Sequence, residues 1–288
     1  MHLGYFTKDS SFPFFIQYGY HDKDVAMHLH ADFSELVIVM NGTAMHQVDN
    51  DSYFIKKGDV FVLGDDIQHG YSSTNKLQIC NIMFQPRMLL DSEYDIRKLP
   101  GFHALFVIEP YLTKKHEFQS RLSLKLQQFE EIHTLTDTML REYESHAPGR
   151  NTMLSSYFMV LVTLLSRFYA LPGQETETNA INIAKSVSYI ENNFTESLSI
   201  DELAEISHLS TRHFTRLFTA SYHITPGNYI LSLRMQYACQ LLKNTSETIS
   251  EIALQTGYGD SNYFSRQFRK FHGISPREYR SKYYAEIL

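Results

Sequence analysis

The chain has 288 residues, of which 43% are hydrophobic and 20% charged, and it carries a net charge of -6. This composition is typical of a soluble globular protein, and the length is sufficient for two domains that each bury a core. The charge is uneven: residues 1–179 hold 15 basic and 22 acidic side chains, a balance of -7, whereas residues 180–288 hold 11 and 10, a balance of +1. Residues 210–282 alone hold 10 basic and 4 acidic side chains. Nucleic acid is therefore not excluded as a partner, because phosphate groups respond to the local field.

The longest apolar run, residues 158–165, is far shorter than the roughly 20 residues that cross a bilayer. The sequence therefore predicts no membrane-spanning segment and no membrane partner. The two cysteines, Cys80 and Cys239, both lie in apolar stretches. This is typical of reduced, buried thiols in a cytoplasmic protein.

Short aromatic and β-branched runs fill the first part of the chain. They are separated by turn residues such as Asn41-Gly42 and Lys57-Gly58. Several short strands at close spacing predict a small β-barrel or sandwich over residues 1 to about 90.

The periodicity changes at Glu117, after which apolar residues recur at steps of three and four. This pattern predicts an amphipathic helix that ends at residues 146–149, followed by a second helix over residues 153–170. The apolar positions of the first helix are Leu122, Leu126, Phe129, Ile132, Leu135, Met139 and Leu140. Two helices packed on one barrel would not bury all their apolar side chains, so we expect part of this surface to form a homodimer interface. Residues 171–179 are mostly polar, as expected of a linker.

The C-terminal third contains an internal repeat. The segment from Ser199 matches the segment from Thr248 at an offset of 49 residues and, after one inserted residue, at an offset of 50. Both copies begin with a capping-box pattern, in which Ser199 is followed by Glu202 and Thr248 by Glu251, so a helix is predicted to start at the same point in each. Each copy then predicts a short helix, a tight turn and a second helix, which is a helix-turn-helix motif. The two motifs cover residues 199–222 and 248–272.

The second helix of each motif has an apolar face and a polar face. The apolar faces are predicted to hold Phe214, Phe218 and Ser221 in the first copy and Phe264, Phe268 and Phe271 in the second. Arginine can bind guanine with two hydrogen bonds, asparagine can bind adenine, and serine or threonine can bind bases or phosphates. The polar residues that we predict to contact DNA are Arg212, Thr215, Arg216, Thr219, Ser261, Asn262, Ser265, Arg266 and Arg269. Two such helices in tandem indicate that the polar faces bind a double-stranded DNA operator and are not merely solvated surfaces.

A third helix is predicted between the two copies, over residues 231–245, with Leu233, Tyr237 and Leu241 on one side. Such a helix would hold the two recognition helices at a fixed separation. They could then enter successive major-groove faces about one helical turn apart.

Residues 183–284 resemble the DNA-binding domain of the AraC family of bacterial transcription regulators. The motifs that carry the resemblance are Ile252-Ala253, Gly257-Tyr258, Tyr263-Phe264, Phe268-Arg269, Gly273-Ile274-Ser275-Pro276 and Tyr279-Arg280. In the first copy, His223 stands where glycine is common in the family. The resemblance implies a C-terminal domain that binds DNA, an N-terminal domain that senses a ligand and dimerises, and RNA polymerase as a further partner.

His28 and His30 precede the strand-like run from Glu35. Residues i and i+2 of an extended chain point to the same face, so the two imidazoles are expected to lie together. The spacing from these histidines to Glu35 and Gly42 resembles the first cupin motif, and the region that ends at His69 resembles part of the second. In metal-binding cupins these positions supply three histidines and a carboxylate. The resemblance therefore implies His28, His30, Glu35 and His69 as candidate ligands of a divalent transition metal.

Two functions are compatible with this pattern. The first is a sensor whose pocket binds a small hydroxylated effector, with or without a metal, through His28, His30, Glu35, His46, His69 and Tyr71. The second is a metal-dependent cupin enzyme fused to a DNA-binding domain. The N-terminal stretch is most similar to the rhamnose-regulator branch of the AraC family, so we favour a non-enzymatic sensor of a sugar such as rhamnose, with no required cofactor. The role of His46 remains open, because it is either a pocket residue or an exposed strand residue. The role of Glu35 also remains open, because it is either a pocket residue or a carboxylate paired with a histidine.

The expected fold class is a multidomain α+β protein. The expected parts are a cupin-like ligand-sensing β-barrel over residues 1–100, a helical connector and dimerisation region over 101–170, a linker over 171–179 and an all-α DNA-binding domain over 180–288. The expected function is ligand-responsive, sequence-specific regulation of transcription in the cytoplasm, of genes for carbohydrate uptake or catabolism. Activation is the favoured mode of regulation, although the sequence does not decide between activation and repression. The effector and the operator also remain open.

Overall fold

The structure is a computed structural model that describes residues 1–7, 9, 11–65, 67–89, 95–113, 122–170 and 179–287. The chain forms two compact units, Met1–Ala184 and Lys185–Leu288. The division between them falls inside helix α5 (Asn179–Asn193). The predicted linker lies outside the described residues, apart from Asn179, which begins this helix.

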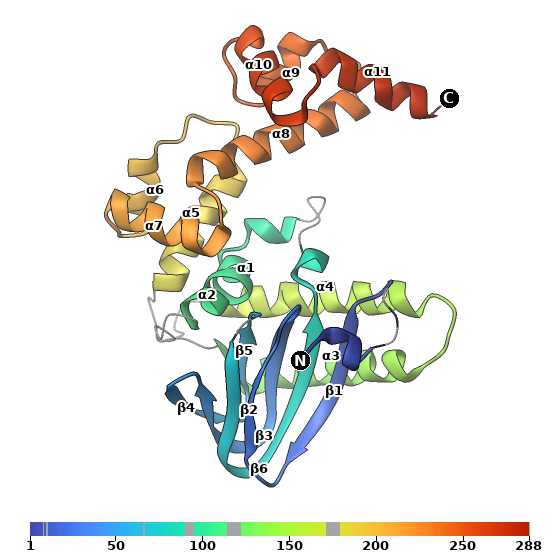
Figure 1. Cartoon of the computed structure of the whole chain (residues 1–288), viewed down its shortest axis with the longest axis vertical. Helices are drawn as coiled ribbons and strands as arrows, with labels where there is room; N and C mark the ends of the chain where they lie inside the picture. Colours follow the sequence, from blue (N-terminus) through green and yellow to red (C-terminus); the bar gives the residue numbers. More distant parts are fainter. Residues whose placement is uncertain are drawn as a thin grey trace. The chain divides into compact units, whose positions relative to one another are not determined.

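An antiparallel sheet forms the described part of the N-terminal unit together with helices on its side (Figure 1). Its strands are β1 (Phe14–His21), β2 (Val25–Leu29), β3 (Ser34–Val48), β4 (Asp51–Lys56), β5 (Asp59–Leu63), β6 (Gln68–Phe84) and β7 (Leu122–Ser123). The strand order is β1-β6-β3-β5-β7, and β2 pairs with β6 while β4 pairs with β3. The cupin-like, strand-rich domain that the sequence predicts is thereby confirmed.

The two longest strands, β3 and β6, change partners along their length. The first part of β3 pairs with β5 and the last part with β4, and β6 runs beside both parts. The pairing register shifts between Val39 and Met45, where Gly42 has a φ of +74°. A Cβ atom at this position would lie 2.2 Å from the backbone oxygen of Lys76, so only glycine fits. The predicted turn at Asn41-Gly42 is therefore wrong: these residues bend a continuous strand.

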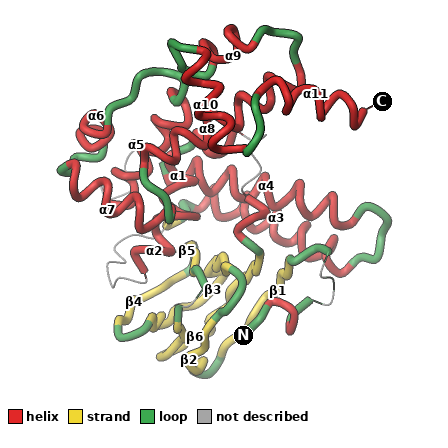
Figure 2. The backbone as a smooth tube through the Cα atoms, turned by 45° about the horizontal axis from the view of Figure 1, so that its top comes forward, coloured by secondary structure: helices red, strands yellow, loops and turns green. Residues whose placement is uncertain are grey.

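A 3₁₀ turn, Leu3–Tyr5, precedes β1. Several short helical segments lie between β6 and β7: the 3₁₀ turns Pro86–Leu89 and Asp95–Lys98, helix α1 (Pro100–His103), a π-helical turn at Ala104–Ile108 and helix α2 (Glu109–Thr113). Two long helices, α3 (Leu126–Glu144) and α4 (Arg150–Tyr169), lie side by side (Figures 1 and 2). The predicted helix from Glu117 is wrong in its first part, because Leu122 is buried and pairs with Val60 of β5. Residues 117–121 lie outside the described residues. Helix α3 begins only at Leu126, whose side chain is 75% exposed.

Helix α4 is long and apolar enough to cross a membrane by length and composition, in the part of the chain that the structure describes. The sequence-based expectation missed it because it considered only the run at residues 158–165, which is shorter than the helix. The helix instead contributes to the core of the N-terminal unit. Its Phe158 is buried, and the ring packs against Phe14 of β1 and Phe84 of β6 at centroid distances of 5.4 Å and 4.9 Å.

The described part of the C-terminal unit is helical, as predicted. After α5 come α6 (Ile200–Ile206), α7 (Thr211–Tyr222), α8 (Pro226–Asn244), α9 (Ile249–Gln255), α10 (Ser261–His272) and α11 (Pro276–Ile287). Helices α6 and α7 form one helix-turn-helix motif, α9 and α10 form the other, and α8 joins them (Figure 2).

Side-chain caps set the starts of these helices. The hydroxyl groups of Ser199 and Thr248 accept hydrogen bonds from the backbone N–H groups three residues later. The reciprocal half of the capping box is present at Thr248, whose N–H donates to Glu251 at 2.7 Å. In the first copy the carboxylate of Glu202 instead accepts a hydrogen bond from the hydroxyl of Tyr189 at 3.1 Å. The predicted box is thus complete only in the second copy.

Candidate functional site

The helices α7 and α10 each bury one face and expose the other. Phe214 and Phe218 of α7 and Phe264 and Phe268 of α10 are fully buried. The prediction that Phe271 shares the buried face of α10 is wrong, because its side chain is 47% exposed. The ring of His272, four residues after Phe268, packs against Phe268 at a centroid distance of 4.5 Å and takes the next position of the buried stripe instead.

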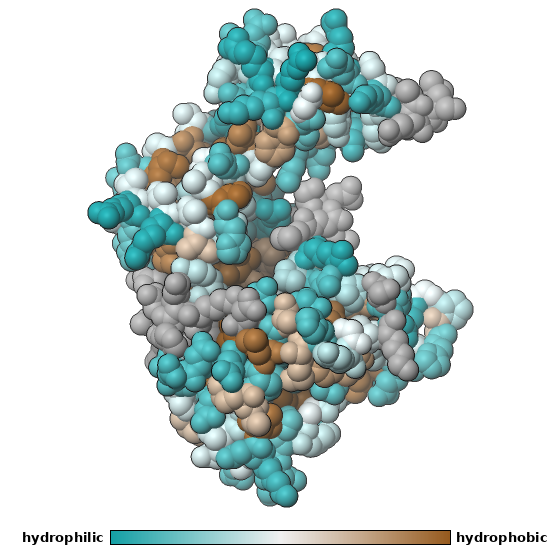
Figure 3. Space-filling model, in the orientation of Figure 1, coloured by the Kyte–Doolittle hydropathy of each residue, from teal (hydrophilic) through white to brown (hydrophobic). Residues whose placement is uncertain are grey.

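None of the predicted DNA-contact residues of α7 and α10 is buried, in contrast to the phenylalanine rings of these helices. Five of them are exposed: Arg212, Arg216, Asn262, Arg266 and Arg269. The other four are partly buried: Thr215, Thr219, Ser261 and Ser265. Exposed arginine and asparagine side chains on one helix face are able to reach base edges in a major groove. The visible surface of the C-terminal unit is mostly hydrophilic (Figure 3).

The two recognition helices end in the same backbone conformation. Gly273 terminates α10 in the left-handed region with a φ of +78°, and His223 terminates α7 with a φ of +59°. Histidine is one of the residues that tolerate this conformation better than most others. The departure from glycine at residue 223 therefore leaves the geometry of the turn intact.

The sensor candidates form a buried histidine–glutamate cluster inside the N-terminal unit. His28 is on β2 and pairs in register with His69 of β6, His30 follows β2, and Glu35 and His46 are on β3. Glu35 is paired with β5, whereas His46 lies in the part of β3 that is paired with β4. The bend of β3 at Gly42 thus brings both ends of this strand to one cluster.

His69 lies at the centre of this cluster. Its Nε2 atom is 3.3 Å from Nε2 of His30 and 3.3 Å from Oε2 of Glu35, and its Nδ1 atom is 3.4 Å from Nε2 of His46. Oε2 of Glu35 is also 3.6 Å from Nε2 of His30. The His28 ring lies 4.2 Å from that of His69, between centroids. Four residues distant in sequence therefore face one central imidazole.

Burial distinguishes the members of the cluster. His30, Glu35, His46 and His69 are at most 1% exposed. Of the two alternatives that the sequence left for His46, an exposed strand residue is therefore excluded. Tyr71 is also buried, and its ring stacks on that of His46 at 5.2 Å. Among these residues, His28 is only partly buried and marks the solvent edge of the cluster.

Two aromatic residues that the sequence did not single out complete the walls. The ring of Phe33 stacks on His30 at 4.4 Å, and the ring of Phe61 stacks on His46 at 4.6 Å. Both rings are buried and pack flat against the imidazoles, which holds the imidazoles in place. In the sequence these phenylalanines are indistinguishable from the other core residues of β-strands.

Burial keeps the histidine–glutamate cluster close to neutral. Desolvation lowers the pKa of His30 to about 3 and that of His69 well below its usual value. Desolvation also raises the pKa of Glu35 to about 8. Near pH 7 the imidazoles of His30 and His69 are therefore uncharged, and the carboxyl group of Glu35 is mostly protonated. The cluster holds polar atoms without a hydrogen-bond partner in the described structure, namely Nδ1 of His30, Oε2 of Glu35 and the hydroxyl of Tyr71.

The donor atoms of this cluster fit a divalent transition metal. An ion bound tetrahedrally at about 2.0–2.1 Å requires neighbouring donors roughly 3.3–3.4 Å apart. The three edges between Nε2 of His30, Nε2 of His69 and Oε2 of Glu35 are 3.3, 3.3 and 3.6 Å. One ring nitrogen each of His28, His30 and His69 also lies within 4.8 Å of the others. Imidazole and carboxylate donors suit Zn, Fe(II), Mn or Ni.

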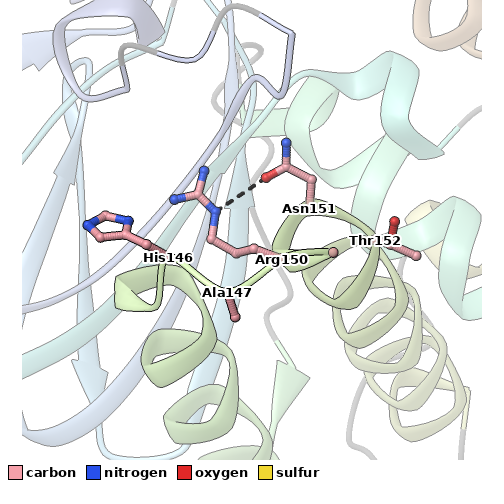
Figure 4. A pocket seen from close by; sticks show the side chains of 6 residues that line it. His146, Ala147, Arg150, Asn151 and Thr152 are labelled. Atoms are coloured by element: carbon pink, nitrogen blue, oxygen red, sulfur yellow. Dashed lines mark hydrogen bonds between the residues drawn. The ribbon is translucent and has the colours of Figure 1, made fainter.

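A separate hollow lies at the surface, at the turn between α3 and α4 (Figure 4). It is lined by residues of this turn, including His146, Arg150 and Asn151, and Nε of Arg150 donates to Oδ1 of Asn151 at 3.3 Å. These side chains lack the burial and the convergence of the histidine–glutamate cluster, which remains the better candidate for ligand binding.

Comparison with known proteins agrees with this arrangement. An "AraC-like ligand binding domain" model matches residues 14–162, and a "Helix-turn-helix domain" model matches residues 203–282. The HTH-type transcriptional activator RhaS of Enterobacter sp. (strain 638) is 31% identical over 87% of this chain and 86% of its own length. The HTH-type transcriptional activator RhaR of Mannheimia succiniciproducens is 26% identical over 98% of this chain and 96% of its own length. Among solved structures, an AraC-type regulator from Chromobacterium violaceum is 36% identical over 35% of this chain and 91% of that chain, with a TM-score of 0.34.

The fold and the matches define a DNA-binding transcription regulator with an N-terminal ligand-binding domain. The chain belongs to the AraC family, whose ligand-binding domain model covers about half of its residues. Its full-length relatives are transcriptional activators. The regulator is therefore favoured over the metal-dependent enzyme.

Proposed function

We propose that the N-terminal unit senses a small hydroxylated effector of the sugar class at the histidine–glutamate cluster. The observation that carries this proposal is the convergence of imidazole, carboxyl and phenol groups in a buried site, several of whose polar atoms lack a hydrogen-bond partner. Unpaired buried polar groups are costly, and a bound ligand that satisfies them gains affinity and orientation. The rings of Phe33 and Phe61 stack on His30 and His46 and keep these imidazoles in place for the effector. Resemblance to the rhamnose-regulator branch makes rhamnose the first effector to test.

The C-terminal unit supplies the response. The exposed side chains of α7 and α10 contact an operator in double-stranded DNA, and the chain activates genes for carbohydrate uptake or catabolism by acting with RNA polymerase. The support for activation is that the full-length relatives are transcriptional activators. In this proposal the chain is a cytoplasmic homodimer, and the N-terminal unit is a sensor without enzymatic activity.

A divalent metal ion is a second element of the proposal, at His28, His30, Glu35 and His69. The support is the donor triangle described above, whose edges match those of a tetrahedral site. The hydrogen bond between Nδ1 of His69 and Nε2 of His46 would orient the central ligand, because Nδ1–H of His69 would donate when its Nε2 holds the ion. An ion there would hold Glu35 deprotonated and supply open coordination positions to hydroxyl groups of the effector.

Thermal denaturation of the full-length chain with a panel of ligands tests the proposal. L-rhamnose, other monosaccharides and divalent metal ions are added separately and in pairs. We expect one sugar to raise the melting temperature in a concentration-dependent manner, because a ligand at 100 times its Kd stabilises the native state by about 2.7 kcal/mol. The same sugar is expected to switch a promoter fused to a reporter gene. An unchanged melting temperature with every sugar and metal would contradict a sensor site at this cluster.

A further inference from the structure

Arg234 lies in the middle of α8, between the two helix-turn-helix motifs, and its guanidinium group binds three backbone oxygens. Nε donates to the oxygen of Phe194 at 2.7 Å, Nη2 to that of Glu196 at 2.7 Å and Nη1 to that of Gly257 at 3.1 Å. Phe194 and Glu196 are in the connection between α5 and α6, whereas Gly257 is in the turn between α9 and α10. A single side chain therefore joins the segment that leads into the first motif to the turn of the second motif.

The backbone of the turn in the second motif also touches the connection that leads into the first motif. Gly257 has a φ of +82°, and a Cβ atom there would lie 2.2 Å from the backbone oxygen of Thr195 and 3.1 Å from Cζ of Arg234. The ring of Tyr258 faces the same guanidinium group, with Cζ 5.3 Å from its centroid. The contact between the motifs thus depends on the absence of a side chain at residue 257 and on the planar donor group of Arg234.

Without this contact, α8 would be the main element that sets the position of one motif relative to the other. A helix of 19 residues is about 28 Å long, so a small bend or pivot moves the far motif by ångströms. Hydrogen bonds to base edges require side chains to be placed within about 0.5 Å. Arginine is suited to restrict such movement, because its rigid fork of donors forms several charge-assisted hydrogen bonds at once, which lysine does not.

We propose that Arg234 is a positioning residue for two-site DNA recognition: it fixes the separation of the recognition helices α7 and α10 by holding the residue 194–196 connection against the turn at Gly257. Arg234 then contributes to affinity without touching a base. The gain in affinity appears only when both recognition helices bind DNA. Once the first helix is bound, binding of the second is intramolecular, and the fixed separation places it at its half-site. This role rests on DNA binding by both motifs.

The test uses the full-length chain and a duplex that the wild-type protein selects from a random library. Affinity is measured by fluorescence anisotropy on the selected duplex and on two versions with one half-site scrambled. For Arg234→Ala we expect at least a tenfold loss on the two-site duplex and less than about a twofold change on each single-site duplex. Arg234→Lys keeps the charge and is expected to show the same pattern. Gln240→Ala, an exposed position of α8, is the control and should bind as the wild type does.

A matched pair of glycine variants tests the same junction from its other side. Gly257→Ala is expected to reproduce the selective loss on the two-site duplex, because the methyl group forces the Thr195 backbone away. Gly259→Ala is the control in the same turn, since a Cβ atom at residue 259 meets nothing within 4 Å. Insertion of one base pair between the half-sites should weaken the wild type strongly and Arg234→Ala only slightly.

Several outcomes would overturn the proposal. Equal losses on two-site and single-site duplexes would mean that Arg234 only stabilises the fold, and full two-site affinity of Arg234→Lys would mean that it acts as a charge near phosphate. An unchanged two-site affinity for Arg234→Ala would remove the positioning role while leaving the DNA-binding function in place. If the wild-type protein selects no sequence, sequence-specific binding fails, and the positioning role fails with it.

Discussion

Arg266 is the first candidate for base recognition, because it is exposed on the recognition helix of the second motif, with Cζ 5.9 Å from the ring centroid of Tyr263. We expect Arg266→Ala to reduce the discrimination between a selected duplex and random DNA by about 1 to 3 kcal/mol, the value of one bidentate contact with guanine. Titrations of both duplexes measure the difference in binding free energy between them. Lys270→Ala removes a charge from the same helix and is the control, expected to weaken binding to both duplexes alike. The same equal loss with Arg266→Ala would assign that residue to the phosphate backbone.

His30 and His69 are expected to separate sensing from DNA binding. His30→Ala and His69→Ala should abolish the effector-dependent rise in melting temperature, because each removes a donor at the centre of the cluster. Ligand-free DNA binding should stay near the wild-type level, since the C-terminal unit has its own core. His133→Ala, a more exposed histidine on α3, is the control. If the metal is present, elemental analysis should find about one ion per chain, and chelation should cause the same loss. A double variant that responds to the effector with unchanged potency would move the sensing site elsewhere.

A buried histidine outside the cluster makes the N-terminal unit sensitive to acid. Burial lowers the pKa of His103 to about 3 from the 6.5 of an exposed histidine. Between these values the unfolded chain binds a proton that the folded chain does not, so stability is fully present above pH 6.5 and is lost as the pH falls towards 3. At pH 5 the loss is on the order of 2 kcal/mol. Urea denaturation at pH 7 and pH 5 should show a smaller decrease for His103→Gln than for the wild type, whereas exposed His146→Gln should match the wild type.

At the scale of the element, the bend in β3 is what assembles the histidine–glutamate cluster. Gly42→Ala places a methyl group against the Lys76 carbonyl and strains a positive φ. We expect it to destabilise the N-terminal unit by more than about 2 kcal/mol, measured by denaturant unfolding. Gly4→Ala is the control, because a Cβ atom there meets nothing within 4 Å. Equal stability of the two variants would show that the strands adjust, and that the bend does not depend on glycine.

The long helices show how an element's boundary depends on its partners. The periodic leucines beyond Glu117 predict one continuous helix, but Leu122 is buried as part of β7, paired with β5. Helix α3 then starts where the side chain of Gln128 accepts a hydrogen bond from the N–H of Lys125 at 2.8 Å. Periodicity over a few residues does not distinguish a helical turn from a short strand whose partner is distant in sequence.

At the scale of the whole molecule, we expect a dimer that forms through the N-terminal unit. The apolar side chains of Met153 and Val160 on α4 are 42% and 48% exposed, a surface that association would cover. Sedimentation velocity at tens of micromolar should show a dimer for the wild type and a monomer for Val160→Glu. Phe54→Glu, at another exposed apolar position, on β4, should remain dimeric. A wild-type monomer under these conditions would contradict the prediction.

The sequence by itself determined the two kinds of domain, the tandem helix-turn-helix motifs and the polar faces of their recognition helices. These features depend on local periodicity, capping residues and an internal repeat, all of which act within a few turns of chain. It also suggested that His28 and His30 lie together, because alternate residues of a strand share a face.

Only the tertiary structure decided that His46 is buried with Glu35 and His69, and that Phe33 and Phe61 stack on this cluster. It also revealed the junction at which Arg234 joins residues 194–196 to Gly257. The physical reason is the same in both cases. These contacts connect residues far apart in the chain, and their geometry depends on a strand bend and a close backbone approach that no short segment of sequence encodes alone.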